Sequence, residues 1–238
     1  MPNLVIDIGN TRIKSAIFEN ADLTWEGVFD EVEEALVAWS ENKFDHCLVS
    51  SVRWTEVELL NLLPFDFIVL TPQTQFPTTN EYGSPATLGL DRIAAAIGGW
   101  IEAGKGPVLV IDLGSCITFD FVNQDNAYLG GAISPGLAMR ATAMNSLTAR
   151  LPLVELKEKP KKWIGDNTIS CMQIGIWYGV EYELSGQIQA YQQDYPEIKV
   201  FVCGGDAQSF VSLAKDHIFV VPNLVLHGLN CILNHNVE

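Results

Sequence analysis

Short apolar runs and longer amphipathic segments divide the chain into two halves that follow the same order of elements. Each half opens with three runs rich in Val, Ile and Phe, and such runs bounded by Gly and polar residues predict β-strands. They span residues 4–8, 13–19 and 23–29, and again residues 108–113, 116–123 and 126–133. Helical and strand patterns then alternate after each triplet. The sequence therefore predicts an α/β fold with mixed sheets.

The elements after each triplet are predicted from helical spacing of apolar residues and from Pro and Gly punctuation. In the first half we expect helices and strands in the order Glu31–Asn42, His46–Ser51, Thr55–Leu63, Asp66–Leu70 and, beyond a loop from Gln73 to Ala86, Leu88–Ala103. In the second half we expect helices at Leu137–Ser146, from Asn167 or Thr168 to Gln193, from the end of Gly204-Gly205-Asp206 to Lys215 and from Asn223, with strands at 199–203 and 217–221. The junction at Gly104–Pro107 predicts two domains, residues 1–104 and 105–238.

Composition and charge exclude several function classes. The chain has 238 residues, 14 Lys and Arg against 29 Asp and Glu, and a net charge of −15. Such an acidic chain disfavours nucleic acid or an anionic membrane as a partner. We expect a cytoplasmic protein, because no apolar run reaches the length of a membrane span and no secretory leader pattern is present. The five dispersed cysteines, without a C-x-x-C pair, predict neither disulfides nor a structural zinc site.

One short phrase occurs twice at matching places. Val5–Thr11 reads V-I-D-I-G-N-T, and Val110–Ser115 reads V-I-D-L-G-S. Gly lets the backbone approach a ligand closely, and successive free N–H groups form an anion-binding nest. An Asp at the end of a buried strand is costly unless it is paired or holds a cation. A plain hairpin turn would explain one copy. Two copies favour a pair of phosphate-binding turns, here called corners, that bind a metal–nucleotide phosphate chain from both sides.

In so acidic a protein, cations beside glycine motifs are candidates for an anion site: Arg12, Lys14, Arg92 and Arg140. Lys14, on the second strand, could reach a phosphate as a point charge. The pair Asp91-Arg92 follows Gly89 and opens an apolar helix. Asp91 could be a helix-start carboxylate, or it could take a proton from a substrate hydroxyl while Arg92 binds an anionic group. Gly204-Gly205 suits either a tight turn or packing against a flat ring such as adenine.

Taken in order, these motifs resemble the type III pantothenate kinase family over almost the whole chain. The matching residues are Asp7-Ile8-Gly9-Asn10-Thr11-x-x-Lys14, Tyr82-x-x-Pro85, Gly89-x-Asp91-Arg92, Asp112-x-Gly114, Thr118-x-Asp120, Gly130-Gly131-x-Ile133-x-Pro135-Gly136, Asn167-Thr168 and Gly204-Gly205. The resemblance implies an actin/Hsp70/sugar-kinase type fold, in which two RNase H-like domains with mixed β-sheets flanked by helices enclose the active site in a cleft. It also implies a homodimer and ATP-dependent phosphorylation of pantothenate to 4'-phosphopantothenate, the first step of coenzyme A synthesis.

The resemblance also implies roles for single residues. ATP, with Mg²⁺, would be bound by Asp7, Ile8, Gly9, Asn10, Thr11, Arg12, Ile13, Lys14 and Ser115. Pantothenate would be bound by Tyr82, Gly89, Leu90, Asp91, Arg92 and Thr168. Asp91 would be the catalytic base, and Asp112 would hold a monovalent cation, K⁺ or NH₄⁺. The chain departs from the family at Gly114-Ser115-Cys116, where Gly-Thr-Ala is usual, but Ser keeps the hydroxyl.

Two alternatives stay open. The chain could be a kinase for a sugar or another small hydroxylated acid, or a non-catalytic regulator that binds nucleotide or pantothenate. The three intact acids Asp7, Asp91 and Asp112 favour an enzyme. The helix beginning at Thr168 carries Gly175, Gly179 and Gly186, which predicts the close approach of another helix, either of this chain or of a second copy.

Overall fold

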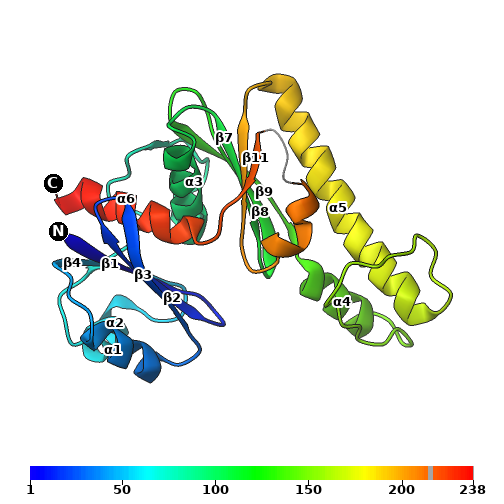
Figure 1. Ribbon diagram of the computed structural model, residues 1–238, viewed down its shortest axis with the longest axis horizontal. Coiled ribbons are helices and arrows are strands. Elements are labelled where there is room, and N and C mark those ends of the chain that lie inside the picture. The colour runs from blue at the N-terminus through cyan, green and yellow to red at the C-terminus, as the bar shows by residue number, and fades with distance from the viewer. Residues whose placement is uncertain (214–216, 238) are drawn as a thin grey trace. The chain divides into compact units, whose positions relative to one another are not determined.

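The structure is a computed structural model that describes residues 1–213 and 217–237 (Figure 1). The chain forms two compact units. The first contains Met1–Gly106, Val122–Leu129 and Asn223–Glu238, and the second contains Pro107–Phe121 and Gly130–Pro222. Among the described residues, no helix combines the length and the apolar character that a bilayer crossing requires.

The first unit is built on a five-stranded mixed sheet in the order β3-β2-β1-β4-β5. Its strands are β1 (Pro2–Ile8), β2 (Ile13–Glu19), β3 (Asp22–Phe29), β4 (His46–Ser51) and β5 (Ile68–Val69). The strand β1 pairs antiparallel with β2 and parallel with β4, so the carboxyl ends of β1 and β4 meet at one edge. The expected triplet forms a meander, and its first strand, β1, lies in the middle of the sheet. The first phrase runs along β1 and therefore ends at the edge where the carboxyl ends of β1 and β4 meet.

The two faces of this sheet carry different residues, as the period of two along a strand requires. One face presents Leu4, Ile6 and Ile8 to a core that includes residues of α1 (Val32–Ser40) and α2 (Glu56–Leu62). The other face presents Asn3, whose amide donates to Oδ1 of Asn230 at 3.0 Å, on α6 (Leu224–Val237). The sheet is therefore covered by helices on both sides, and the last helix is one of them.

The helix α6 also packs closely against α3 (Leu90–Glu102), and Figure 1 shows the two helices crossing. Two glycines make this approach possible. A Cβ placed on Gly228 would collide with the carbonyl of Ala94, and one on Gly98 would collide with the carbonyl of Leu224. The backbones therefore touch where the helices cross.

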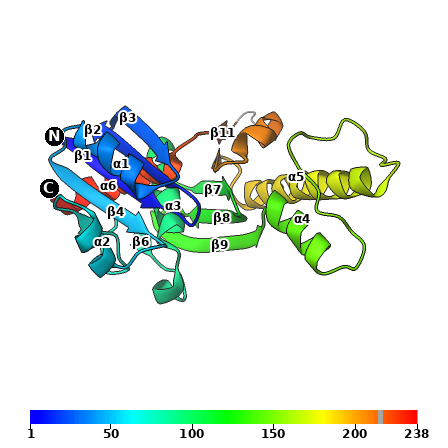
Figure 2. The same cartoon turned by 90° about the horizontal axis from the view of Figure 1, so that it is seen from below.

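The second sheet has the strand order β11-β10-β7-β8-β9-β6 (Figure 2). Its strands are β6 (Thr79–Asn80), β7 (Val108–Leu113), β8 (Cys116–Val122), β9 (Ala127–Pro135), β10 (Lys199–Cys203) and β11 (Ile218–Val220). The remaining elements are α4 (Leu137–Ser146), α5 (Thr168–Asp194) and two short 3₁₀ helices, η1 (Pro85–Thr87) and η2 (Ala207–Leu213).

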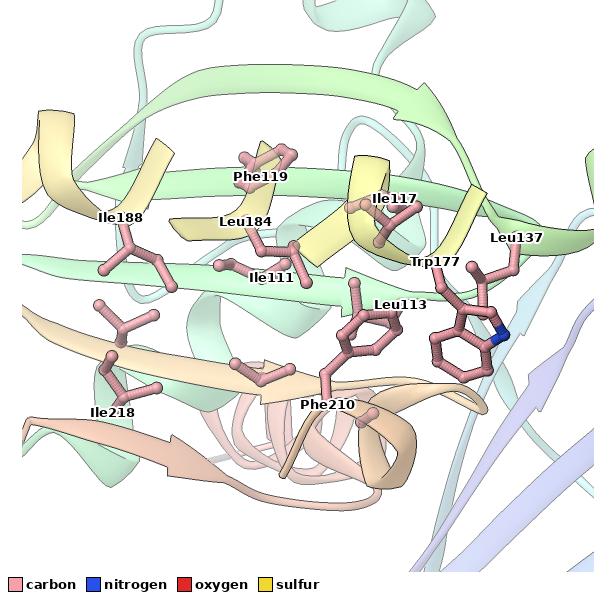
Figure 3. Packing of buried hydrophobic residues seen from close by; sticks show 14 of the residues in the cluster. Ile111, Leu113, Ile117, Phe119, Leu137, Trp177, Leu184, Ile188, Phe210 and Ile218 are labelled. Carbon is pink, nitrogen blue, oxygen red and sulfur yellow. The ribbon is translucent and has the colours of Figure 1, made fainter. Parts of the chain in front are cut away.

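The core of the second unit lies between this sheet and α5 (Figure 3). Ile111 and Leu113 of β7 and Phe119 of β8 point toward Trp177 and Leu184 of α5, and all five are nearly inaccessible. The helix α5 begins at a capping box in which Oδ1 of Asn167 accepts the N–H of Ser170. Burying this apolar layer is the main stabilising term of the unit.

The α/β fold class with two mixed sheets flanked by helices is confirmed. Three details differ from the sequence prediction. The strand β5 is shorter than Asp66–Leu70, and the expected loop at Gln73–Ala86 contains β6, which pairs with Ala127–Tyr128. The segment expected to be helical up to Lys215 is 3₁₀ over Ala207–Leu213, interrupted by non-helical angles at Phe210, and Lys215 lies outside the described residues.

The division into domains 1–104 and 105–238 stays a prediction. The compact units cross that boundary, because α6 and the β8–β9 turn belong with the first unit. The physical reason lies in packing that the sequence pattern does not reveal: α6 covers β1 and β4 and fits the glycine contact on α3.

Candidate active site

The first phrase forms the turn between β1 and β2. Asp7 lies opposite Lys14 across the antiparallel pair and beside Ser50 across the parallel pair. Directly opposed residues point to the same face, so the carboxylate and the ammonium share one side of the sheet edge. The N–H of Gly9 donates to the carbonyl of Arg12 at 3.0 Å and closes the turn. Ile8 and Ile13 are buried beside it and can offer a ligand only their backbone, whereas Asn10 and Thr11 are exposed.

Arg53, which sequence reasoning missed, braces this turn. Its Nη2 donates to the carbonyl of Asn10 at 3.0 Å, and the N–H of Val52 donates to the carbonyl of Ile8 at 3.0 Å. Both follow β4, whose end meets that of β1. Arg12 instead pairs with Asp30 at 3.5 Å, and with 62% and 78% of the side chains exposed this ion pair contributes little stability.

The second phrase forms the turn between β7 and β8. The N–H of Gly114 donates to the carbonyl of Cys116 at 3.0 Å, and the N–H of Gly136 donates to the carbonyl of Ser115 at 3.1 Å. A Cβ on Gly136 would collide with the carbonyl of Gly114. The glycine turn that ends β9 therefore packs directly against this corner and leaves the Ser115 side chain exposed.

A third turn reaches the same corner from β10. Gly204 has a positive φ of +95°, and a Cβ on it would collide with Oδ1 of Asp112. The N–H of Asp206 donates to the carbonyl of Leu113 at 2.9 Å, and burial raises the pKa of the Asp206 carboxyl above its ordinary value. Only glycine fits at position 204, where the chain passes Asp112, whereas a Cβ on Gly205 would meet no atom within 4 Å.

The surroundings of Asp112 fit a hard monovalent cation. Its Oδ1 lies close to the backbone of Gly204, and a Cβ on Gly114 would stand 3.6 Å from it, so two glycines border the carboxylate. Carboxylate and carbonyl oxygens suit hard cations, and in K⁺ channels several backbone carbonyl oxygens arranged in a ring bind the ion. Within the described residues, no three His, Cys, Asp or Glu side chains gather as metal ligands. Any cation here must therefore take most of its ligands from the backbone, hydroxyls or nucleotide.

A third group of predicted site residues gathers at the start of α3. The Arg92 side chain is 8% exposed, and its guanidinium lies 6.0 Å from the ring centre of Tyr82. Asp91 is exposed, and its Oδ1 accepts the N–H of Arg92 at 2.9 Å. Gly89 is the N-cap, and Leu90 is the first helical residue. The structure thus brings an acid, a cation and an aromatic ring together.

The short strand β6 explains how a loop residue such as Tyr82 is positioned. The N–H of Glu81 donates to the carbonyl of Tyr128 at 2.9 Å, and the N–H of Tyr82 donates to Oδ1 of Asn80 at 3.0 Å. The rings of Tyr82 and Tyr128 lie 6.1 Å apart. Pairing with β9 therefore anchors the loop, although the sequence showed only Pro, Asn and Gly there.

Two further candidates lie in the second unit. Thr168 is the exposed first residue of α5, whereas Tyr82, Asp91 and Arg92 belong to the first unit. Arg140 is bound to its own surroundings: its Nε donates to the carbonyl of Pro135 at 2.8 Å, and its guanidinium pairs with Glu183. The charge of Arg140 thus joins α4 to α5.

Two turns with the pattern Asp-x-Gly end strands of mixed sheets, and an Asp-Arg pair opens a helix, on a fold of the actin/Hsp70/sugar-kinase type. The ROK hexokinase of Thermus thermophilus shares this fold, with a TM-score of 0.53, 12% identity and full coverage of both chains. The chain belongs to the type III pantothenate kinase family, whose sequence profile matches residues 3–190.

One curated relative carries the family name, and one solved structure shares the fold. The type III pantothenate kinase of Phocaeicola vulgatus is 40% identical over 240 residues, which cover 98% of each chain. A solved structure described as a Baf family transcriptional activator from Campylobacter jejuni has a TM-score of 0.63 at 25% identity and covers 98% of each chain. The predicted family and the predicted kinase fold are both confirmed.

Proposed function

We propose that this chain transfers the γ-phosphoryl group of ATP to pantothenate, the first step of coenzyme A synthesis, with Asp91 as the catalytic base. Membership of the type III pantothenate kinase family supports the reaction. The observation that carries the residue assignment is the grouping of Asp91, Arg92 and Tyr82 at the start of α3. Asp91 would accept the proton of the substrate hydroxyl, and the Arg92 guanidinium would bind the carboxylate of pantothenate.

Phosphoryl transfer depends mainly on positioning and charge neutralisation. Asp91 would orient and deprotonate the primary hydroxyl of pantothenate, and the hydrogen bond from the N–H of Arg92 restricts where its carboxylate points. Arg92 and Tyr82 would hold the acceptor, together with Gly89, Leu90 and Thr168. The turn from Asp7 to Lys14 and the Ser115 corner would bind the phosphates of magnesium ATP through backbone N–H groups and the Lys14 charge.

A monovalent cation, K⁺ or NH₄⁺, would bind at Asp112. The argument is electrostatic: a carboxylate close to a triphosphate needs a counter-charge, and the protein as a whole carries −15. When bound, the cation would offset the charge of the nucleotide. The enzyme would act in the cytoplasm on small soluble substrates.

The homodimer proposed for this chain would form through α5. A Cβ on Gly175 or Gly186 would meet no atom within 4 Å, and one on Gly179 would meet only Nη1 of Arg140, at 3.7 Å. The glycines therefore do not serve to admit a helix of the described chain. Tyr182, seven residues after Gly175, is 61% exposed. The face of α5 that carries these glycines is therefore available to a second copy. C₂ dimers are the commonest assembly of this kind.

The test is a transfer assay with ATP and a panel of acceptors: pantothenate, hexoses and short hydroxy acids. Asp91→Asn should bind ATP nearly normally and lose about 10²-fold or more in turnover, the usual scale for a general base. Asp22→Asn, which changes an exposed acid at the start of β3, is the matched control and should keep wild-type turnover.

Each alternative predicts a different result. Near-wild-type turnover in Asp91→Asn would reject the base assignment and direct attention to Asp120. Transfer to a sugar but not to pantothenate would support the other kinase, and binding without any transfer would support a regulator.

A further inference from the structure

The sheet of the second unit has a polar face beside Asp112 that extends beyond that residue. Leu109, Ile111 and Leu113 of β7 and Ile117, Phe119 and Phe121 of β8 all belong to the core against α5, as Figure 3 shows for four of them. Successive side chains of a strand point to opposite faces. Asp112 of β7 and both Thr118 and Asp120 of β8 therefore share the opposite face.

The turn fixes which of these residues are neighbours. The N–H of Gly114 donates to the carbonyl of Cys116, so these two residues oppose each other. Counting outward along the hairpin, Asp112 opposes Thr118, in agreement with the shared burial of Leu113 and Ile117. Opposed residues of an antiparallel pair have Cβ atoms about 4.5–5.5 Å apart. The hydroxyl of Thr118 is thus within reach of a cation that Asp112 binds.

The hydrogen bond of Thr118 decides what its hydroxyl can offer. Its Oγ1 donates to Oδ2 of Asp120 at 2.8 Å, and the Asp120 carboxylate has no solvent exposure. A hydroxyl has one proton and two lone pairs. With its proton directed to Asp120, the partly exposed Thr118 oxygen can present only lone pairs to its surroundings.

We propose that Thr118 is a second side-chain ligand of the monovalent cation at Asp112, and that Asp120 is a positioning residue that orients the Thr118 hydroxyl. This inference rests on the proposed cation site. It assigns the Thr118-x-Asp120 motif a physical role: the buried acid determines the direction of a hydroxyl proton, and the hydroxyl oxygen completes a set of hard oxygen ligands.

The experiment measures K⁺ affinity apart from turnover. KCl is titrated against choline chloride at constant ionic strength, with magnesium ADP present, and the midpoint of thermal unfolding is followed. Wild type should be stabilised with a measurable K⁺ dissociation constant. Thr118→Val, which keeps the shape but lacks the oxygen, should raise that constant about 10-fold or more, the scale of one interaction with a charged group. Thr118→Ser, which keeps the hydroxyl, should stay within about 3-fold of wild type.

A second variant tests the positioning role. Asp120→Asn keeps an acceptor oxygen for Thr118 and should weaken K⁺ binding less than Thr118→Val does. In the kinase assay both variants should require more K⁺ for half-maximal activity than wild type does. A purely structural role would instead lower the unfolding midpoint equally at all K⁺ concentrations.

Three outcomes overturn the inference. A wild-type K⁺ dissociation constant in folded Thr118→Val rejects Thr118 as a ligand, and an Asp120→Asn effect as large as that of Thr118→Val rejects the positioning role. A wild type that phosphorylates pantothenate without any K⁺ response rejects the cation site and this inference together. A wild type that responds to K⁺ but does not phosphorylate pantothenate rejects the proposed reaction alone.

Discussion

The crossing of α3 and α6 predicts that Gly228→Ala destabilises the first unit. The new Cβ would collide with the carbonyl oxygen of Ala94. Both groups belong to backbones, so no side-chain rotation relieves the collision and the helices must separate. Overpacking of this kind costs about 1–3 kcal/mol, and a rigid backbone contact belongs at the upper end. Alanine returns about 1 kcal/mol of helix propensity. The net loss in the free energy of unfolding is about 2 kcal/mol.

For a chain of this size, 1 kcal/mol shifts Tm by about 2–4 °C, so Gly228→Ala should unfold about 4–8 °C below wild type. Calorimetry or circular dichroism measures the difference. Gly83→Ala is the matched control, because a Cβ there would meet no atom within 4 Å. It should leave Tm unchanged or raise it slightly, since it reduces the entropy of the unfolded chain. A Gly228→Ala protein that melts at or above the wild-type temperature would refute the close crossing.

Other measurements test three separate features: the dimer, the capping box of α2 and the burial of Asp206. Light scattering should give twice the chain mass, and mixing a Tyr82→Ala chain with an Asp91→Asn chain should partly restore activity if the site is shared between copies; no rescue would indicate self-contained sites. Thr55→Ala removes the capping box of α2 and should lower Tm by about 2–4 °C. Because hydrogen bonds from Thr55 lower the pKa of Glu58, wild type should lose its advantage over this variant as pH falls below about 4.5 in acid titrations. Burial raises the pKa of Asp206, so its native form binds protons more tightly; stability should fall as pH rises above about 4, and Asp206→Asn should flatten that slope in denaturant titrations.

Much of the fold follows from local pattern. The strands of both triplets are found where the apolar runs predict them, because burial on a sheet requires that pattern over consecutive residues. The strand β6 was not predicted, because two exposed residues, Thr79 and Asn80, carry no such pattern and are strands only through pairing with β9. The placement of α6 was likewise not predictable from its periodicity, which gives a buried face but not its partner.

The residues of the candidate site also fall into two groups: those that a sequence motif marks, and those that only the fold brings to the site. Asp7, Asp91 and Asp112 each have a glycine two residues away, so the sequence could single them out. Arg53 has no motif of its own and contacts the first corner only because β4 lies beside β1. A strand-order argument could have found it, since parallel neighbours end at one edge. The Tyr82–Arg92 contact depends on the anchoring of a loop, which no local pattern encodes.

The position of α6 in the chain has a consequence for synthesis. The first unit needs Asn223–Glu238 to cover its sheet, yet the whole second unit is translated in between. At about 5–20 residues per second, the ribosome adds that last helix several seconds after the first sheet has emerged. During that interval Val5 and Phe18 lack the helix that covers their face of the sheet, whereas the second unit already has every segment it needs. The segment made first is therefore the one that completes its fold last, and a chaperone that binds exposed apolar strands would find it there.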